Sequence, residues 1–242
     1  MRIQLKKVFL ISLIFIFLGC DSKNDQKITI SKLKGSPSYS NSKIKSLDLT
    51  KVENEFKFSF EVENYDLGIQ TESEFDFQLA NSSKGQHIHL IINNEPYSAH
   101  YSETFSKKIA EGNNLILAFL SRSYHESVKN QDAFIISQIS DEPFDLNNEF
   151  LFYSRPKGTY KDKDTEKVLL DFYLVNTEIS PNGNKVRATI DDTIFLIDEW
   201  APYYIEGLND GETQIKLELI NSDGNLIDVA FNPSIKTINI EK

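Results

Sequence analysis

Cysteine is nearly absent from this chain, whose 242 residues contain one, Cys20. A single cysteine forms neither an intramolecular disulfide framework nor a cysteine-rich zinc site, so neither stabilises the fold. Basic residues are also outnumbered, with 26 Lys and Arg against 36 Asp and Glu and a formal net charge of −10. Because a nucleic-acid binder needs a basic face to meet phosphates, this balance argues against nucleic acid as a partner.

Common catalytic motifs are missing as well. The sequence contains no GxSxG nucleophile elbow, no HExxH zinc-protease motif and no glycine-rich phosphate loop. We therefore expect a protein without enzyme activity and without a required cofactor. Apolar residues make up 40% of the chain and aromatic residues 12%, which is enough to bury a core and argues against wholesale disorder.

The N-terminus carries a targeting pattern. Three basic residues within the first seven precede an almost wholly apolar run over 8–18, which is followed by Gly19-Cys20. This run is too short for a transmembrane helix, which needs about 20 apolar residues. The pattern is typical of a bacterial lipoprotein signal peptide over 1–19, with Cys20 lipidated and 20–27 as a polar tether. An ordinary signal peptide with a chance cysteine is the alternative.

The remainder of the sequence predicts strands. Apolar and polar residues alternate over 56–63 and again over 215–219. Alternation with period two marks strands that have one buried face. Turn signals rich in Asn, Asp, Gly and Pro separate such runs, and no stretch shows clear helical periodicity. We predict an all-β protein built as two tandem immunoglobulin-like β-sandwiches.

The two halves of the chain repeat one pattern. Segment 59–64 aligns with 171–176, and 85–92 aligns with 183–190, with shared apolar positions and, in the second pair, a shared leading glycine. We interpret this as an internal duplication, for which one continuous sandwich with chance similarity is the alternative. The predicted parts are a first β-sandwich unit over 28–140, a linker over 141–149 and a second β-sandwich unit over 150–242.

All four histidines fall in the first unit, and a predicted hairpin gathers them. A two-residue turn at Asn93-Asn94 brings His87 opposite His100, with His89 on the same face of its strand. Imidazoles gathered in this way are ligands for Zn²⁺ or Cu²⁺. The predicted metal ligands are His87, His89, His100 and, from a later loop, His125. A polar outer strand face that happens to contain histidine is the alternative.

The loop that carries His125 supports a second interpretation. It contains cations and hydroxyls and follows a strand, which is where sandwiches commonly place binding residues. These groups suit a phosphate or phosphopeptide anion. The predicted anion-binding residues are Arg122, Ser123, His125, Ser127 and Lys129. A solvated polar loop is the alternative.

Two features of the second unit point to a junction between the units. The single tryptophan, Trp200, is expected to pack between the units or to cap the second core. The segment 154–160 is basic in an acidic chain. It is interpreted either as lining the junction or as a solvated turn.

Several stretches resemble a group of Bacteroidota lipoproteins without an established activity, some of which are automatically labelled phosphopeptide-binding protein. The stretches are HIHLIINNEPYSAHY (87–101), LAFLSRSYHES (117–127), LFYSRPKG (151–158) and LLDFYLVN (169–176). The resemblance implies a location in the cell envelope, at the outer membrane, and supplies no catalytic residues. The predicted function is a non-enzymatic envelope lipoprotein, anchored through Cys20, that binds a small-molecule, peptide or protein partner. A histidine-based Zn or Cu protein and an anion-binding protein are the alternatives.

Overall fold

The computed structural model describes residues 27–73 and 76–242, so the predicted signal peptide and Cys20 lie outside the described residues. The described residues form four β-sheets, and a short 3₁₀ helix, η1 (Asp162–Thr165), is the only helix among them. None of these residues lies in a helix long and apolar enough to cross a bilayer. The all-β prediction is confirmed.

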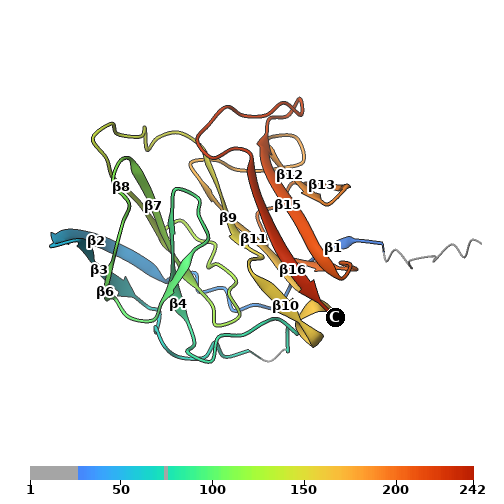
Figure 1. Cartoon of the computed structure of the whole chain (residues 1–242), viewed down its shortest axis with the longest axis horizontal. Helices are drawn as coiled ribbons and strands as arrows, with labels where there is room; N and C mark the ends of the chain where they lie inside the picture. Colours follow the sequence, from blue (N-terminus) through green and yellow to red (C-terminus); the bar gives the residue numbers. More distant parts are fainter. Residues whose placement is uncertain (1–26, 74–75) are drawn as a thin grey trace, which may run out of the picture.

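The first sandwich consists of two sheets that face each other (Figure 1). Its outer sheet has the order β2-β3-β6, and its inner sheet has the order β5-β4-β7-β8. Between them lies a core that includes Phe58, Phe60, Leu90 and Leu120. The strands are β2 (Lys43–Val52), β3 (Glu55–Glu63), β4 (His87–Ile92), β5 (Ser98–His100), β6 (Thr104–Lys107), β7 (Asn114–Ser121) and β8 (Phe134–Ile139).

The second sandwich also has an inner and an outer sheet. The inner sheet has the order β1-β14-β11-β9, and the outer sheet has the order β10-β16-β15-β12-β13. Leu170 and Phe172 of the inner sheet pack in one core with Leu217 and Leu219 of the outer sheet. The strands are β1 (Thr29–Lys32), β9 (Phe150–Arg155), β10 (Thr159–Lys161), β11 (Val168–Val175), β12 (Lys185–Ile190), β13 (Thr193–Ile197), β14 (Tyr203–Glu206), β15 (Gly211–Ile220) and β16 (Ser234–Glu241).

Both sandwiches have the strand order of immunoglobulin-like domains. In the first, β2, β3 and β6 share one sheet, while β5, β4, β7 and β8 form the other. The second repeats this order with β9, β11 and β14 in one sheet and β13, β12, β15 and β16 in the other. The segments aligned in sequence occupy equivalent strands, β3 with β11 and β4 with β12. The predicted tandem sandwiches are therefore confirmed.

The structure corrects the boundary of the first unit at residue 28. Strand β1 lies within the predicted unit 28–140, but it pairs antiparallel with β14 of the second sandwich. Ile28 and Leu33 at the ends of this strand are buried, and the Leu33 amide donates to the Pro202 carbonyl at 2.9 Å. Burial of these side chains and the pairing of a free sheet edge both favour the second sandwich over the first.

The two sandwiches pack against each other through their inner sheets. Strands β4, β7, β9 and β11 are buried along nearly their whole length, so both faces of each inner sheet are covered. Their sequences are accordingly continuous apolar runs rather than alternating ones. The buried residues between the inner sheets, here called the junction core, are Ile91, Tyr97, Leu115, Leu117, Phe119, Phe150, Phe152, Tyr173 and Val175.

The linker and the tryptophan both belong to this junction. Phe144 and Leu146 of the predicted linker pack against the junction core, and the Asn176 side-chain amide donates to the Leu146 carbonyl at 2.7 Å. Trp200 contacts both the junction core and the core of the second sandwich. Its ring is partly buried, and its indole N–H donates to the Phe172 carbonyl at 3.0 Å. The predicted position of Trp200 between the units is confirmed.

Truncation of a junction side chain tests whether the sandwiches form one cooperative unit. Phe152 is fully buried, so Phe152→Ala should lower the free energy of unfolding by about 3–5 kcal/mol. The exposed Ile194 provides a control, because Ile194→Ala should change stability by less than about 0.5 kcal/mol. Urea unfolding followed by Trp200 fluorescence and by circular dichroism should give one coincident transition. Two separate transitions would contradict the coupling.

Candidate metal centre

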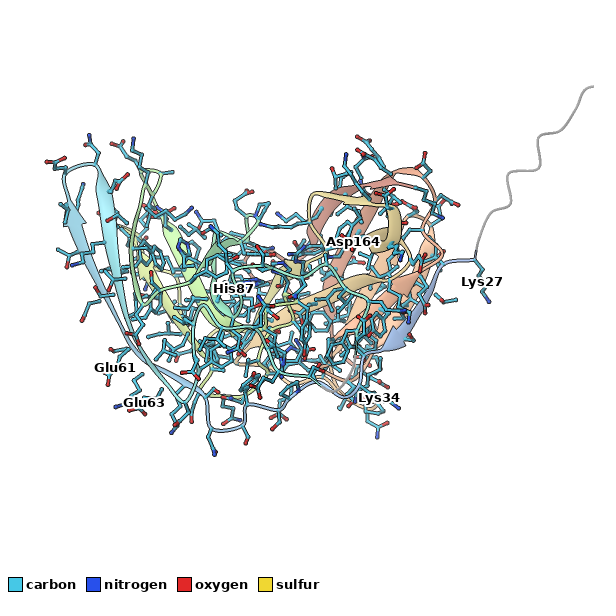
Figure 2. All side chains as sticks on the ribbon, turned by 90° about the horizontal axis from the view of Figure 1, so that it is seen from below. Lys27, Lys34, Glu61, Glu63, His87 and Asp164 are labelled. Atoms are coloured by element: carbon cyan, nitrogen blue, oxygen red, sulfur yellow. The ribbon has the colours of Figure 1, made fainter. Side chains whose placement is uncertain are left out.

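The histidines of β4 point toward the second sandwich. Residues alternate between the faces of a strand, so Ile88 and Leu90 enter the first core while His87 and His89 face the junction. Both histidines are fully buried. Figure 2 labels His87, which lies between the two sandwiches. The loop after β7 adds a third histidine, His125, and these three are here called the histidine cluster.

Three ring nitrogens converge in the cluster. His87 Nε2 lies 2.8 Å from His89 Nε2 and 3.2 Å from His125 Nδ1. All three ligand atoms lie within 4.8 Å of one another. Nitrogen ligands about 2.0–2.1 Å from a tetrahedral ion are about 3.3 Å apart, so the spacing is close to that of a three-histidine metal site.

His125 is held in place by a tight and strained turn. Its φ is +69°, in the left-handed region, which costs a residue other than glycine about 1–3 kcal/mol. Its amide donates to the Arg122 carbonyl at 2.9 Å. A buried ion pair between Arg122 and Glu126, 2.9 Å long, fixes the turn from within. The surrounding structure therefore holds the His125 ring in the cluster against a backbone preference.

Two further groups fix the orientation of the rings. His87 Nδ1 lies 2.8 Å from the Gly85 carbonyl, to which it donates, so its Nε2 keeps a free lone pair toward the cluster. Ser154 Oγ of β9 lies 3.5 Å from His89 Nδ1, at the long limit of a hydrogen bond. Gly85 has φ +87°, and a Cβ there would lie 2.5 Å from the Ile69 backbone. Glycine is required at position 85 to present this carbonyl.

Burial keeps the three rings neutral at physiological pH. Desolvation, with smaller contributions from the nearby Arg155 and Lys157 cations, lowers the pKa of His87 to about 4. The same burial lowers the pKa of His125 to about 2, and it holds the pKa of His89 well below its usual value. Neutral imidazole is the form that binds metal ions, whereas a pKa so far from 7 is unsuited to general acid–base catalysis.

Tyr97 of the first sandwich and cations of the second sandwich surround the cluster. The Tyr97 ring stacks on His89 with centroids 3.5 Å apart, and Lys157 Nζ lies 3.7 Å from the centroid of the same ring. Arg155 is buried, and its Nη1 donates to the Tyr160 hydroxyl at 3.1 Å. The interpretation of 154–160 as lining the junction is correct for these residues. Gly85 stood out in the sequence as the leading glycine of a repeated segment and Ser154 as the first residue of the basic segment 154–160, but neither pattern linked them to the histidines.

The structure excludes His100 from the cluster. The turn at Asn93-Asn94 forms as predicted, but the ladder then pairs Ile88 with His100 instead of His87 with His100. The turn sets Ile92 opposite Glu95, whereas the ladder sets Leu90 opposite Ser98, so one extra residue is accommodated between Glu95 and Ser98. A shift of one residue moves a side chain to the other face of the sheet. His100 therefore stacks on Phe105, with ring centroids 3.4 Å apart, on the side of the first core.

The equivalent places in the second sandwich hold different residues. Its hairpin sets Val186 opposite Ile197. Strand β15 pairs Lys185 with Ile220 just as β7 pairs His87 with Ser121. By this equivalence Lys185 and Arg187 stand where the first sandwich has His87 and His89. In the turn after β15, the Gly224 amide donates to the Asn221 carbonyl at 3.0 Å, as the His125 amide does to Arg122. Gly224 therefore stands in the place of His125.

The predicted anion pocket is not an open site. Arg122 is buried, and its guanidinium contacts Glu126 together with the carbonyls of Ser127 and Pro37. Lys129 is paired with Asp171, and the Ser127 hydroxyl donates to the same carboxylate at 3.1 Å. Ser123 Oγ accepts from the Thr71 amide at 3.3 Å. Internal carboxylates therefore already neutralise both cations, so only His125 of this set faces a shared site.

The buried neutral histidines predict a stability that falls in acid. Because the pKa of His87 is lower in the folded chain than its usual 6.5, the unfolded chain binds the extra proton between about pH 6.5 and 4. Stability is therefore highest above pH 6.5 and falls as the pH decreases through this window. From pH 7 to 5 the loss is about 2 kcal/mol for this one histidine.

The variant His87→Gln should lose that part of the pH dependence. Urea unfolding at pH 7 and pH 5, in the presence of a chelator, should show a difference between the two pH values about 2 kcal/mol smaller in His87→Gln than in the unsubstituted chain. Equal pH dependence in both chains would show that His87 is not buried as a neutral ring.

Comparison with known proteins adds distant structural likenesses. The sequence matches no family model, and no curated protein matches it. Fibronectin(III)-like modules of Clostridium thermocellum CbhA are 10% identical with a TM-score of 0.30, covering 81% of this chain and 94% of theirs. The central fibronectin-III array of RIM-binding protein is 8% identical with a TM-score of 0.27, and the match covers 82% of this chain and 68% of that one. The chicken CNTN1 FN1–FN3 domains are 12% identical with a TM-score of 0.24, and the match covers 83% of this chain and 66% of that one. At these TM-scores the assignment of the fold rests on the strand order itself.

Proposed function

We propose that this protein is a non-enzymatic metal-binding module of the cell envelope that holds Zn²⁺ or Cu²⁺ at the junction of its two sandwiches. The ligands are His87, His89 and His125. The observation that carries the proposal is the convergence of three ring nitrogens, one from each of these histidines, within 4.8 Å of one another. Imidazole nitrogen suits both metals.

The environment of the rings supports a metal rather than a purely structural role. Metal-binding histidines usually donate their second ring N–H to a carbonyl, carboxylate or other acceptor, as His87 does to the Gly85 carbonyl. The rings are neutral at pH 7, so no proton must be displaced from them before an ion binds. Three such rings turned toward one point are a ready ligand set.

The second sandwich supports the same conclusion by contrast. At the place equivalent to His89 it has Arg187, whose Nε donates to Glu218 at 2.8 Å. At the place equivalent to His125 it has Gly224. Glycine takes the positive φ of that turn without a steric cost, whereas His125 does not. The fold alone therefore does not require imidazoles at these places, which supports a role for them in binding.

The burial of the site favours a held ion over catalysis. His87 and His89 have no exposed surface, and Tyr97, which stacks on His89, is itself only 3% exposed, while His125 is the one ligand that is partly exposed. A catalytic metal keeps an open coordination position for water or substrate, whereas an enclosed one serves structure, storage or transfer. This enclosure supports the proposal of a non-enzymatic protein whose ligand is the ion.

The envelope location rests on the sequence around Cys20, and it is part of the proposal. In Figure 2 the labelled Lys27 lies at the side of the second sandwich that faces away from the first. A lipid anchor at Cys20 would therefore hold the second sandwich next to the membrane. Stable anchoring of this kind needs two or more acyl chains.

Metal titration with matched histidine variants tests the site. The untagged chain from residue 21 onward should bind one Zn²⁺ or Cu²⁺ by calorimetry. His89→Gln and His125→Gly should each weaken binding by about 100-fold or more, because each removes a direct ligand. His125→Gly copies the second sandwich at position 224 and relieves the positive φ, so it should fold at least as stably in the absence of metal.

His100→Gln serves as the control for this titration. His100 lies on the same sheet but faces the first core, so its substitution should leave the affinity for metal unchanged. Absence of saturable binding by the unsubstituted chain would reject the metal proposal. Equal affinity in all of the histidine variants would reject this ligand set.

Membrane attachment is tested separately. The full chain, expressed in a bacterium that processes lipoproteins, should fractionate with the envelope and incorporate labelled fatty acid. Cys20→Ala should abolish the labelling and release the protein as a soluble species, because the acidic chain is repelled by anionic lipid surfaces. Recovery of both chains in the soluble fraction would contradict the anchor.

A further inference from the structure

We propose that Tyr97 is the fourth ligand of the metal centre and binds through its phenolate oxygen. The centre would then be a three-histidine, one-tyrosinate site for a divalent ion. This inference rests on the proposed function, since it concerns the same ion. It adds a ligand of different chemistry, supplied by the residue that lies between the histidine cluster and the second sandwich.

The position of the tyrosine hydroxyl fits a fourth ligand. Tyr97 Oη lies 3.2 Å from His125 Nδ1, which itself lies 3.2 Å from His87 Nε2. These separations match the spacing of about 3.3 Å between neighbouring ligands of a tetrahedral ion. Without metal, the same hydroxyl can donate a hydrogen bond to His125 Nδ1. The tyrosine hydroxyl therefore already lies beside one of the cluster nitrogens before the ion arrives.

The tyrosine ring has little freedom to move away from this position. It is 3% exposed and lies parallel to the His89 ring, with centroids 3.5 Å apart and an interplanar angle of 16°. Lys157 holds it from the second sandwich in two ways. Its Nζ donates to the Tyr97 carbonyl at 2.7 Å and lies 3.7 Å from the ring centroid.

The charges around the cluster call for an anionic ligand. The three imidazoles are neutral, and among the described residues the converging group of ligand atoms includes no carboxylate. Arg155 and Lys157 already place two cations beside the Tyr97 ring. A buried divalent ion bound by neutral nitrogens alone would add two uncompensated positive charges, which is costly. A phenolate reduces that charge by one. Burial raises the pKa of the Tyr97 hydroxyl and Arg155 offsets this rise only in part, so the phenolate forms when the ion takes the place of the proton.

The binding step balances without any redox partner. The divalent ion takes the place of the phenolic proton: the O–H bond of Tyr97 breaks, a metal–oxygen bond forms, and the proton leaves to solvent. The tyrosine and the metal both keep their oxidation states. Nitrogen and phenolate donors together suit Cu²⁺, which serves as the probe because its bond to phenolate gives a visible charge-transfer absorption.

A second tyrosine on the cluster provides the matched control. The Tyr101 ring lies 5.1 Å from the His87 ring, centroid to centroid, so it contacts the cluster as Tyr97 does. Its hydroxyl, however, lies 2.8 Å from Ser82 Oγ and is engaged there. Tyr101→Phe therefore removes a hydroxyl near the cluster without removing the proposed ligand.

Titration with Cu²⁺ while recording the visible absorption spectrum tests the proposal. The unsubstituted chain from residue 21 onward should develop a phenolate-to-copper band that saturates at one ion per chain. Tyr97→Phe keeps the stacked ring, and therefore the packing on His89, but should abolish the band and weaken Cu²⁺ binding by about 10- to 100-fold. Tyr101→Phe should retain both the band and the affinity.

The outcomes separate this proposal from the one it rests on. Tight Cu²⁺ binding without the band, or a band that persists in Tyr97→Phe, would overturn the tyrosinate ligand and leave the three-histidine site intact. Absence of Cu²⁺ and Zn²⁺ binding by the unsubstituted chain would overturn both. Circular dichroism of Tyr97→Phe confirms that the variant is folded before its spectrum is interpreted.

Discussion

The packing of one inner sheet on the other is the interaction on which the rest of this molecule depends. Phe119 of β7 stacks on Tyr173 of β11 with centroids 4.6 Å apart, and Trp200 meets the same tyrosine edge-on at 5.0 Å. Burial of these aromatic faces stabilises the interface more than the small, polar contacts that are usual between domains of one chain. It turns two domains into one body with three apolar layers.

The candidate site is a product of that packing. His87 and His89 belong to the first sandwich, but Ser154, Arg155 and Lys157, which surround them, belong to the second. Arg155 and Lys157 of the second sandwich add to the effect of burial in lowering the pKa values of the rings. A buried polar group needs partners that replace water, and here the junction provides both the enclosure and the partners. Fold and site therefore share one cause.

Much of the fold was predictable from the sequence because its signals are local. Period-two alternation, turn residues and the repeated segments led to two immunoglobulin-like sandwiches with equivalent strands. The continuous apolar runs in β7 and β11 also indicate strands that are buried on both faces. Such runs predict two inner sheets packed on each other. Alternation of apolar and polar residues marks only strands with one buried face, so it does not predict this packing.

The details of the site were less predictable because they depend on single residues and on distant contacts. One extra residue near Pro96 moved His100 to the opposite face, and no propensity shows whether a hairpin shifts by one. Arg122 and Lys129 were predicted to bind an anion, but in the structure they pair with Glu126 and Asp171. Tyr97 is indistinguishable in sequence from a core aromatic residue, because its partners His125, Arg155 and Lys157 are distant in the sequence.

The pairing of β1 with β14 has a mechanical consequence. The first sandwich lies wholly between these two strands in the chain, so it is an insert within the loop that they close. Such long-range pairing forms late in folding, because the ends of a long loop must meet before their contacts contribute. Once formed, the pairing of β1 with β14 resists tension at the start of β1. A force that pulls on Lys27 acts first on the hydrogen bonds between these two strands. The first sandwich, with its histidines, is thereby shielded from tension applied at Lys27.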